Sequence, residues 1–536
     1  MQGSFSIGHR WRRGFAAGLL GFLSLGLTGN SDASAQTTLR VAMTAGDLPD
    51  WTGHPDQGAE GQRFVGFSLY DSIINWDLTR SDREAPLAPG LATKWYVDEK
   101  DHTRWIFELR RDVKFHDGCP WNADAAVWGM ARIMDDKAPQ FNTIHFARNR
   151  SRTSNIASVE KIDDYTIAVR TKVIESIFPY NMATMFMISK CALEKVNYDY
   201  KEYAKAPAGS GPYKFASVVP HERLELVKNA TYWNPARIPK HDRLVLLPMP
   251  EATTRAAALL SGQVDFIEAP SPDTIPRLKS GGMTVTLLQY PHNWHYQFNF
   301  QRGPFKDLRI RRAANYAVDR KEVVDMLGGV AVESYATFTP SQSIYGKPVK
   351  YEYDPKKATA LLKEAGCYPC AITVGISTSG SGQMQPLSMN ELVKSQLEAA
   401  GFKVKFEIMD WNAILDAFFK GWEKSPTLDA MNISLSSIDP VSGLINHFST
   451  PKRGPNGFNW GWYDNKEFDR LSEEALKTFE PEKQLQLFTR LHEMVNEDAG
   501  RLFIVHDLNP RAMSPKVKGF VPAQSWMQDI VTIKLD

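Results

Sequence analysis

Two cysteines three positions apart, Cys367 and Cys370 in the run KEAGCYPCAITV, have the spacing of a redox pair, a metal clip or a local disulfide. Thiol oxidoreductases place such a pair at the N-terminus of a helix, where the helix dipole lowers the pKa of a thiol. Here a predicted helix (354–366) ends just before Cys367, and a predicted strand (371–377) begins just after Cys370. Because the dipole at this end of a helix opposes a thiolate, we expect a disulfide that fastens a loop. An exported thiol oxidoreductase is the alternative.

The rest of the chain offers no catalytic motif. It contains no H-E-x-x-H, no G-x-S-x-G, no Walker loop and no G-x-G-x-x-G. His292 and His295 lie three positions apart on a predicted strand, which points them to opposite faces and argues against a shared metal. Cys119 and Cys191 are each expected to be isolated substitutions, although a bridge between them stays open. We therefore expect no enzyme activity, no cofactor and no metal.

The first 35 residues have the pattern of a secretory signal peptide. Three arginines precede an uncharged apolar run (15–29), and an A-x-A cleavage pattern (33–35) follows it. The apolar run is shorter than the roughly 20 residues that a membrane-spanning helix needs. Arg12 and Arg13 also resemble a twin-arginine signal, so the export route stays open. The mature protein is expected to be soluble and periplasmic, with no stable membrane insertion.

The size and charge of the mature chain narrow its function further. The whole chain has 63 basic and 61 acidic residues, and the leader holds three arginines and one aspartate, so the mature chain is formally neutral. Nucleic acids and anionic membranes are bound through basic surfaces, which argues against both as partners. More than 500 residues also exceed what one hydrophobic core normally serves, so at least two lobes are expected.

Hydrophobic spacing indicates an α/β protein in which helices separate the strands. Alternation predicts strands over 38–43 and 292–301, and helical spacing predicts helices over 63–77 and 122–136. Asn122 is the expected N-cap of the latter helix.

Five phrases in a fixed order resemble the extracellular solute-binding proteins of family 5, the peptide and nickel binders of ABC importers. They are LAPGLATKWYVDEKDHTRWIFELRRDVKFHDG (87–118), GSGPYKF (209–215), YWN (232–234), ALLSGQVDF (258–266) and PFKDLRIRRAANYAVDRKEVV (304–324). The resemblance implies a two-lobe periplasmic binding protein fold of the cluster C type, with a hinge and a subdomain inserted in the first lobe. Its expected parts are the signal peptide (1–35), lobe I (36–70, 208–286 and 505–536), the insert (71–207) and lobe II (287–504).

The resemblance also suggests which residues contact a ligand between the lobes. Trp294 and Tyr296 alternate along the strand that enters lobe II, and either form a wall of the cleft or belong to the sheet core. Trp411 follows a predicted strand and either contacts the ligand or packs inside. Trp460 and Trp462 lie in a loop and could stack on a flat ligand group.

The run SSIDP (436–440) bears on the class of ligand. The family's peptide binders typically have an acidic residue three positions before the aspartate of the D-P pair, where it holds the peptide's amino group. This chain has Ser436 there. Asp439 could replace the missing acid, but an aspartate before proline is more typical of a turn or a cap. Capture of a peptide amine in the usual way is therefore in doubt, because a buried ammonium without a carboxylate partner is costly.

Together these observations predict a binding protein that delivers a peptide-like or amino-acid-derived small solute to the permease subunits of an ABC transporter. The alternative within the same fold is a non-peptide ligand: an opine, a sugar conjugate or a metal chelate.

Overall fold

The structure is a computed structural model that describes residues 36–380 and 382–536. The chain divides into two compact units, Met1–Gln36 and Thr37–Asp536. The predicted signal peptide, with its arginines and cleavage site, lies outside the described residues. Within the described residues, no helix combines the length and the apolar character needed to cross a membrane.

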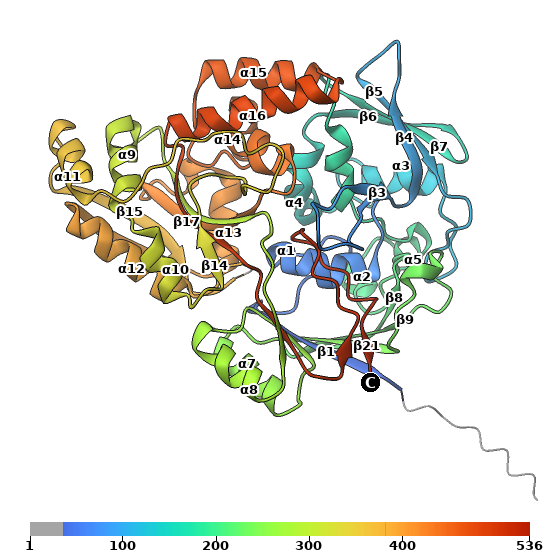
Figure 1. Cartoon of the computed structure of the whole chain (residues 1–536). Helices are drawn as coiled ribbons and strands as arrows, with labels where there is room; N and C mark the ends of the chain where they lie inside the picture. Colours follow the sequence, from blue (N-terminus) through green and yellow to red (C-terminus); the bar gives the residue numbers. More distant parts are fainter. Residues whose placement is uncertain (1–35, 381) are drawn as a thin grey trace, which may run out of the picture. The chain divides into compact units, whose positions relative to one another are not determined.

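One mixed sheet has seven strands in the order β12-β19-β11-β1-β10-β9-β8. Its strands β1, β8 and β9 are labelled in Figure 1. The strands are β12 (Thr284–Thr286), β19 (Arg511–Met513), β11 (Phe266–Glu268), β1 (Thr38–Met43), β10 (Arg243–Pro248), β9 (Arg223–Lys228) and β8 (Tyr213–Val219). β1 runs parallel to β10 and β11. Its side chains alternate, so that Leu39, Val41 and Met43 enter one core while Ala42 packs in another with Leu259 of α7 (Ala252–Leu260). The strand predicted over 38–43 is thereby confirmed.

A second mixed sheet has the order β14-β18-β13-β17-β15-β16. Its strands are β14 (Ala331–Glu333), β18 (Arg501–Asp507), β13 (His292–Phe298), β17 (Ala430–Ser436), β15 (Cys370–Ser377) and β16 (Phe402–Met409). One face is covered by α9 (Leu308–Ala317), α10 (Arg320–Met326), α11 (Pro355–Glu364) and α12 (Pro386–Ala399). The other face packs against α13 (Trp411–Lys420) and α16 (Pro481–Glu497). Both faces are therefore buried, and all seven residues of β13 are buried with them.

A third sheet is antiparallel, in the order β4-β5-β7-β6. It consists of β4 (Ala92–Val97), β5 (Arg104–Leu109), β7 (Thr166–Thr171) and β6 (Ile156–Asp163). Two capped helices accompany it. The side chain of Asn122 accepts a hydrogen bond from the Ala125 N–H at the start of α3 (Ala123–Ala131), which confirms the predicted cap. Asn142 accepts from the His145 N–H at the start of α4 (Thr143–Thr153).

Shorter elements complete the described part of the chain. They are α1 (Gly58–Gly61), η1 (Gln62–Gly66), α2 (Phe67–Leu69), β2 (Ile74–Trp76), β3 (Leu87–Pro89), η2 (Phe178–Thr184), α5 (Lys190–Lys195), α6 (Tyr200–Tyr203), η3 (Pro235–Arg237), η4 (Pro272–Thr274), α8 (Ile275–Ser280), η5 (Pro304–Lys306), η6 (Trp422–Lys424), η7 (Val441–Ile445), α14 (Asn446–Phe448), η8 (Thr450–Lys452), α15 (Lys466–Lys477), β20 (Val517–Lys518) and β21 (Lys534–Leu535).

The helix predicted over 63–77 is wrong in its second half. Helical turns end at Leu69, and Ile74–Trp76 pairs with β3, so a strand takes the apolar positions assigned to the helix.

The four cysteines form two disulfides. Cys119 and Cys191 are bonded with an S–S distance of 2.01 Å, so the expectation that each is an isolated substitution is wrong. Ser189, the N-cap of α5, also donates its hydroxyl to Asp117 in the turn that carries Cys119, so a hydrogen bond joins the same two segments. A separation of 72 positions hides such a contact from sequence reading. Cys367 and Cys370 are also bonded, between the end of α11 and β15.

The three large sheets draw on different parts of the predicted lobes. The seven-stranded sheet uses strands from the ranges expected for lobe I, and the four-stranded sheet uses strands from the insert (71–207). The six-stranded sheet uses lobe II, although β18 continues three residues past the expected boundary to Asp507. The division itself stays a prediction, because Thr37–Asp536 forms a single compact unit.

Candidate ligand-binding site

A cavity of about 730 Å³ lies within the described residues. One side is formed by the segment 54–62, by α4 and by η2. The opposite side is formed by α13, the end of β17, and the segment 438–447, while Trp526 and Met527 also border it. The volume falls within the range typical of small-molecule sites. The lining comes from segments that lie several hundred positions apart in the sequence.

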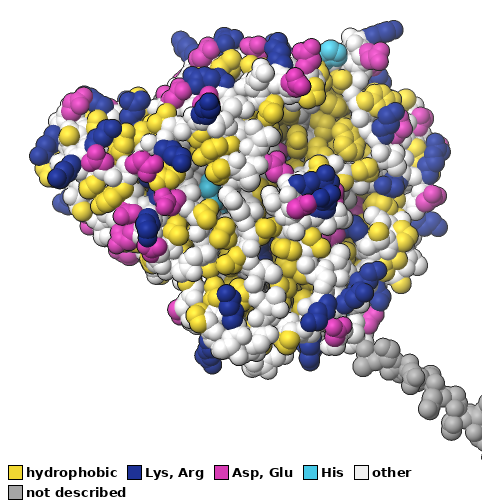
Figure 2. Space-filling view, in the orientation of Figure 1, with side chains coloured by type: hydrophobic (Ala, Val, Ile, Leu, Met, Phe, Trp, Pro, Cys, Tyr) yellow, Lys and Arg dark blue, Asp and Glu magenta, His cyan; other side chains and the backbone are white. Residues whose placement is uncertain are grey.

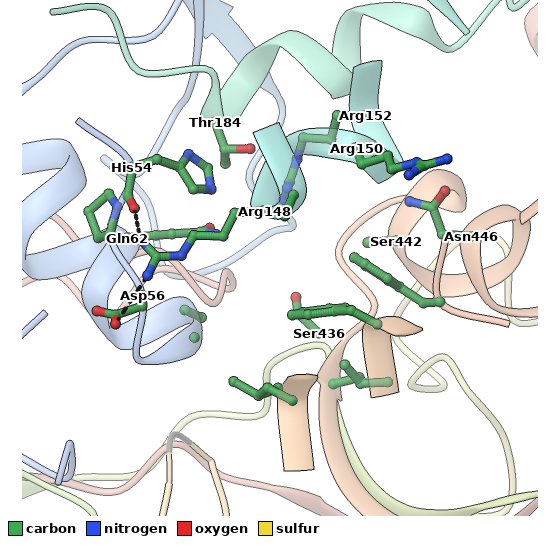
Figure 3. A pocket seen from close by; sticks show the side chains of 18 of the residues that line it. His54, Asp56, Gln62, Arg148, Arg150, Arg152, Thr184, Ser436, Ser442 and Asn446 are labelled. Carbon is green, nitrogen blue, oxygen red and sulfur yellow. Dashed lines mark hydrogen bonds and ion pairs between the residues drawn. The ribbon is translucent and has the colours of Figure 1, made fainter. Parts of the chain in front are cut away.

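Three arginines on α4, each two positions from the next, border this cavity. The Arg148 guanidinium donates to Asp50 at 2.9 Å and to the His54 carbonyl at 2.7 Å, and it forms an ion pair with Asp56 at 3.3 Å. Figure 3 shows this side chain directed toward His54 and Asp56. The charge of Arg148 is thus neutralised inside the protein.

The two following arginines differ in their partners. Arg150 donates through Nε to the side-chain oxygen of Asn456 at 3.0 Å. Arg152 has no hydrogen bond and no ion pair with any described residue. Burial lowers the pKa of Arg152, and the nearby Asp439 carboxyl opposes this shift. In Figure 3 Arg152 lies between the other two arginines, on the side of the cavity opposite Ser436.

The acidic side chains that line the cavity are already engaged. Asp56 is paired with Arg148, and Asp416 is paired with Lys420 at 2.7 Å. Asp439 accepts the N–H of Ser442 at 2.7 Å, in the first turn of η7 (N-cap Pro440). Burial raises the pKa of Asp439. Among the described residues, no carboxylate lining the cavity is therefore left without a partner.

The opposite side of the cavity is largely apolar. Asp410 begins α13 by accepting the Ala413 N–H at 3.0 Å. Because Trp411, Leu415 and Phe419 recur every four positions, they lie on one helix face, and all three line the cavity. This stripe can pack against an apolar part of a ligand, while α4 supplies charge.

Several buried polar atoms of the lining have no hydrogen-bond partner among the described residues. They are Ser436 Oγ, Trp411 Nε1, Trp526 Nε1, Thr184 Oγ1, Asn446 Oδ1 and His447 Nδ1. Burial, with Arg501 nearby, lowers the pKa of His447 well below its usual value, so its imidazole is neutral. Buried polar groups normally have partners, so these atoms are available to a ligand.

The structure brings three of the predicted ligand residues to the cavity: Trp411, Ser436 and Asp439 line it. Trp294 and Tyr296 instead lie in the sheet core, because β13 is covered on both faces. The Trp294 indole donates to Gln383 at 2.9 Å, and the Tyr296 hydroxyl donates to Asn390 at 2.6 Å.

The two loop tryptophans also lie outside the lining. Trp460 is fully buried, and its indole donates to the Ser425 hydroxyl at 3.0 Å. Trp462 packs edge-on against Trp422 and beneath the Arg453 guanidinium. Trp294, Tyr296, Trp460 and Trp462 were candidate ligand contacts, but the structure places all four outside the lining of the cavity.

Sequence reading missed the arginines of α4. The alternating run RNRSR (148–152) is the signal that could have revealed them, since three cations in one helical turn and a half rarely serve a core. Their different partners, however, come from segments far away in the sequence.

One face of the molecule is mixed in charge. Figure 2 shows Lys and Arg side chains interspersed with Asp and Glu over the face drawn. Among the described residues, no group of three or more His, Cys, Asp or Glu is placed to hold a metal ion.

The sequence of the chain is similar to a family model and to several binding proteins. The family model of the bacterial extracellular solute-binding proteins, family 5 (middle region), matches residues 86–454. The chain is 28% identical over 477 residues to heme-binding protein A of Haemophilus influenzae, a match that covers 84% of each chain. It is 28% identical over 467 residues to the glutathione-binding protein GsiB of Escherichia coli K12, covering 85% of this chain and 86% of that protein.

A solved structure shows the same fold. The ABC transporter-associated periplasmic binding protein DppA of Helicobacter pylori, in complex with the peptide STSA, has a TM-score of 0.79 and 23% identity. The match covers 93% of this chain and 98% of that chain. The fold is thus the two-lobe α/β fold of periplasmic binding proteins.

Proposed function

The chain belongs to the bacterial extracellular solute-binding proteins of family 5, and from this premise we propose that it captures a peptide-like or amino-acid-derived solute in the 730 Å³ cavity. It then delivers the solute to the permease subunits of an ABC importer. The protein acts in the periplasm, after the signal peptide (1–35) is removed.

The observation that carries this proposal is the composition of the cavity. An apolar stripe on α13 faces polar groups from α4, and several buried polar atoms between them lack partners. Such a lining recognises an amphipathic small molecule by burying its apolar part and completing hydrogen bonds with its polar part. Movement of the predicted lobes about the hinge would admit the solute and then exclude water.

A non-peptide solute, namely an opine, a sugar conjugate or a metal chelate, is the second candidate. The observation that favours it is Ser436, whose hydroxyl lines the cavity where a peptide's ammonium would need a carboxylate. The lining carboxylates of Asp56 and Asp416 are already held in ion pairs.

A thermal-shift screen of the purified mature protein against peptides, opines, oligosaccharides and metal chelates tests the proposal. A solute at one hundred times its Kd should stabilise the folded state by about 2.7 kcal/mol. Stabilisation by peptides or amino-acid derivatives supports the first candidate. If only another class raises the melting temperature, the peptide-like assignment fails, and if no class does so, solute capture in this cavity fails.

The proposal includes no catalytic step, and it assigns the Cys367–Cys370 disulfide a structural role. The rival function, thiol oxidation, requires both cysteines. Cys367 follows the end of α11 and Cys370 begins β15, so neither sulfur lies at the N-terminus of a helix, where the dipole would lower the pKa of a thiol.

A further inference from the structure

We propose that Ile177 and Phe479 form a clasp that holds the two sides of the cavity together and acts equally on every solute. This inference rests on the proposed function and adds how firmly a captured solute is retained. The clasp is an exchange of side chains between two hydrophobic cores that meet beside the cavity. One, the β5 core, contains buried residues of β1, β5 and β7, and the other, the α16 core, contains buried residues of α15 and α16.

Ile177 lies directly before η2 but packs in the α16 core, where its side chain is 4% exposed. Within the described residues, the other buried members of this core all come from 338–503. The next residue, Phe178, packs instead in the β5 core, where its ring centroid lies 6.2 Å from that of Trp105. Two consecutive side chains therefore enter two different cores, and the chain joins the cores at this point.

Phe479 makes the reciprocal contact. It lies between α15 and α16, yet its half-buried ring packs against the β5 core. The ring centroid lies 5.0 Å from that of His102 and 6.3 Å from that of Trp105 in β5. In Figure 1 α15 and α16 lie next to the four-stranded sheet to which β5 belongs. Each core thus buries one large apolar side chain of the other, which favours their contact.

Polar contacts at Ser176 join the same two segments. The Ser176 N–H donates to the Leu476 carbonyl at 2.7 Å, and the Ser176 hydroxyl donates to the Ala475 carbonyl at 3.2 Å. Gln484 donates to the Ser176 hydroxyl at 2.6 Å. The last carbonyls of an α-helix have no partner within the helix, so Ser176 supplies donors to the end of α15. Parting of the two cores would break these hydrogen bonds.

The clasp lies next to the cavity without lining it. The segment η2 begins directly after Ile177, and three of its residues line the cavity: Tyr180, Asn181 and Thr184. Neither Ile177 nor Phe479 borders it. Because these two side chains do not meet the solute, they stabilise the solute-holding arrangement by the same amount for every solute, and also without one. The apparent affinity falls in proportion when the binding-competent state is less populated.

Spin-label distances in the mature protein without solute test the inference. All four native cysteines are in disulfides, so the labels can be placed at two exposed positions, Ile162→Cys in β6 and Gln486→Cys in α16. The wild-type clasp should give a population at short distance. Phe479→Ala should lower the ratio of short to long distances about 2- to 12-fold, the factor that corresponds to the loss of one aromatic pair. Ile177→Ala should lower it further, because its side chain is more deeply buried.

Two dipeptides, Ala-Phe and Gly-Leu, test whether the clasp acts equally on different solutes. Calorimetry gives Kd, and stopped-flow tryptophan fluorescence gives koff. Phe479→Ala should raise both by about 2- to 12-fold for each dipeptide and leave the ratio of the two Kd values unchanged. Phe406→Ala is the matched control, since its half-buried ring packs against the core of the six-stranded sheet and does not line the cavity. It should change neither the distances nor koff.

The outcomes separate the clasp from the function on which it rests. A wild-type protein with only long distances, or distances that stay the same in Phe479→Ala and Ile177→Ala, overturns the inference and leaves solute capture standing. Unequal losses of affinity for the two dipeptides also overturn it, because Phe479 would then select the solute. An equal shift in Phe406→Ala does so as well, since it would reflect general destabilisation. If the distances shift as expected but neither dipeptide binds the wild-type protein, the clasp stands and the peptide-like assignment fails.

Discussion

Glu268, at the end of β11, neutralises two buried guanidiniums, and its removal should be costly. Its carboxylate oxygens lie 2.6 Å from Nη2 of Arg63 and 2.6 Å from Nη2 of Arg511. The three side chains are at most 5% exposed. Glu268→Gln keeps the shape but leaves two buried cations without this carboxylate. Breaking such a buried pair typically lowers the free energy of unfolding by about 3–5 kcal/mol.

The nearby carboxyl group of Glu60 affects how much the free energy of unfolding falls in Glu268→Gln. Glu60 accepts hydrogen bonds from the Thr44 N–H at 2.6 Å and the Thr44 hydroxyl at 2.8 Å. Burial and the neighbouring Glu268 carboxylate raise the pKa of Glu60 well above its usual value, which favours the protonated form of Glu60. In Glu268→Gln the repulsion between the two acids is gone, and Glu60 can ionise toward Arg63. The single variant should therefore lose less than the double variant Glu60→Gln/Glu268→Gln, which should show the full loss of about 3–5 kcal/mol.

Glu60→Gln is the matched control, because glutamine resembles the protonated acid. It should change the free energy of unfolding by less than about 1 kcal/mol at pH 7. Urea unfolding of the four proteins gives the coupling energy between the two sites. The reasoning is refuted if Glu60→Gln costs as much as Glu268→Gln, or if the two single losses add up to the loss in the double variant.

The pH dependence of stability has a defined sign for each acid. The raised pKa of Glu60 means that its contribution is present below its unfolded pKa and is lost as the pH rises. Glu60→Gln should therefore gain stability relative to wild type toward alkaline pH. Burial opposes ionisation of Glu268, but Arg511 and Arg63 hold its pKa at about 2. Its contribution is present above its unfolded pKa and is lost as the pH falls toward 2, so Glu268→Gln should flatten the acid side of the curve.

Three further predictions concern the site and its supports. Cys367→Ser/Cys370→Ser should leave the Kd for the solute unchanged. It should lower the free energy of unfolding by about 2 kcal/mol, the value that chain entropy gives for a loop of this length. Loss of function with the fold intact would favour the thiol oxidoreductase. Gly380→Ala should weaken binding in calorimetry, because the added Cβ would lie 2.3 Å from the Trp411 ring at a φ of +123°; an unchanged Kd would show that this ring does not contact the solute. Lys452→Met should weaken binding as well, because Lys452 donates to the Ser151 carbonyl at 3.0 Å and so holds the end of α4; unchanged binding would show that α4 is positioned without it.

Local features of the fold could be predicted from the sequence, because short-range physics determines them. Alternation gave β1, and the Asn122 side chain marked the start of α3. Alternation along β13 could not tell which face meets a ligand, because the sheet is covered on both sides and every residue of the strand is buried. For Trp294 and Tyr296 a cleft wall and the sheet core both stayed open, and the structure places the two residues in the core.

The charge state of the cavity could not be predicted in the same way. The run 148–152 shows three arginines, but not that Asp50 and Asp56 neutralise the first. Nor does it show that the last lies near the Asp439 carboxyl, with no hydrogen bond or ion pair to a described residue. Likewise, the link between Cys119 and Cys191 depends on a turn that meets a helix 72 positions later. These properties arise from tertiary contacts, which residue spacing does not encode.

The same tertiary contacts connect the stability of the fold to the cavity. Arg63, which pairs with Glu268, also donates through Nη1 to the Trp526 carbonyl at 3.2 Å, and Trp526 lines the cavity. On the opposite side, Lys452 and Asn456 hold α4 from a segment about 300 positions away. The solute is therefore met by groups whose positions depend on buried polar contacts between distant segments.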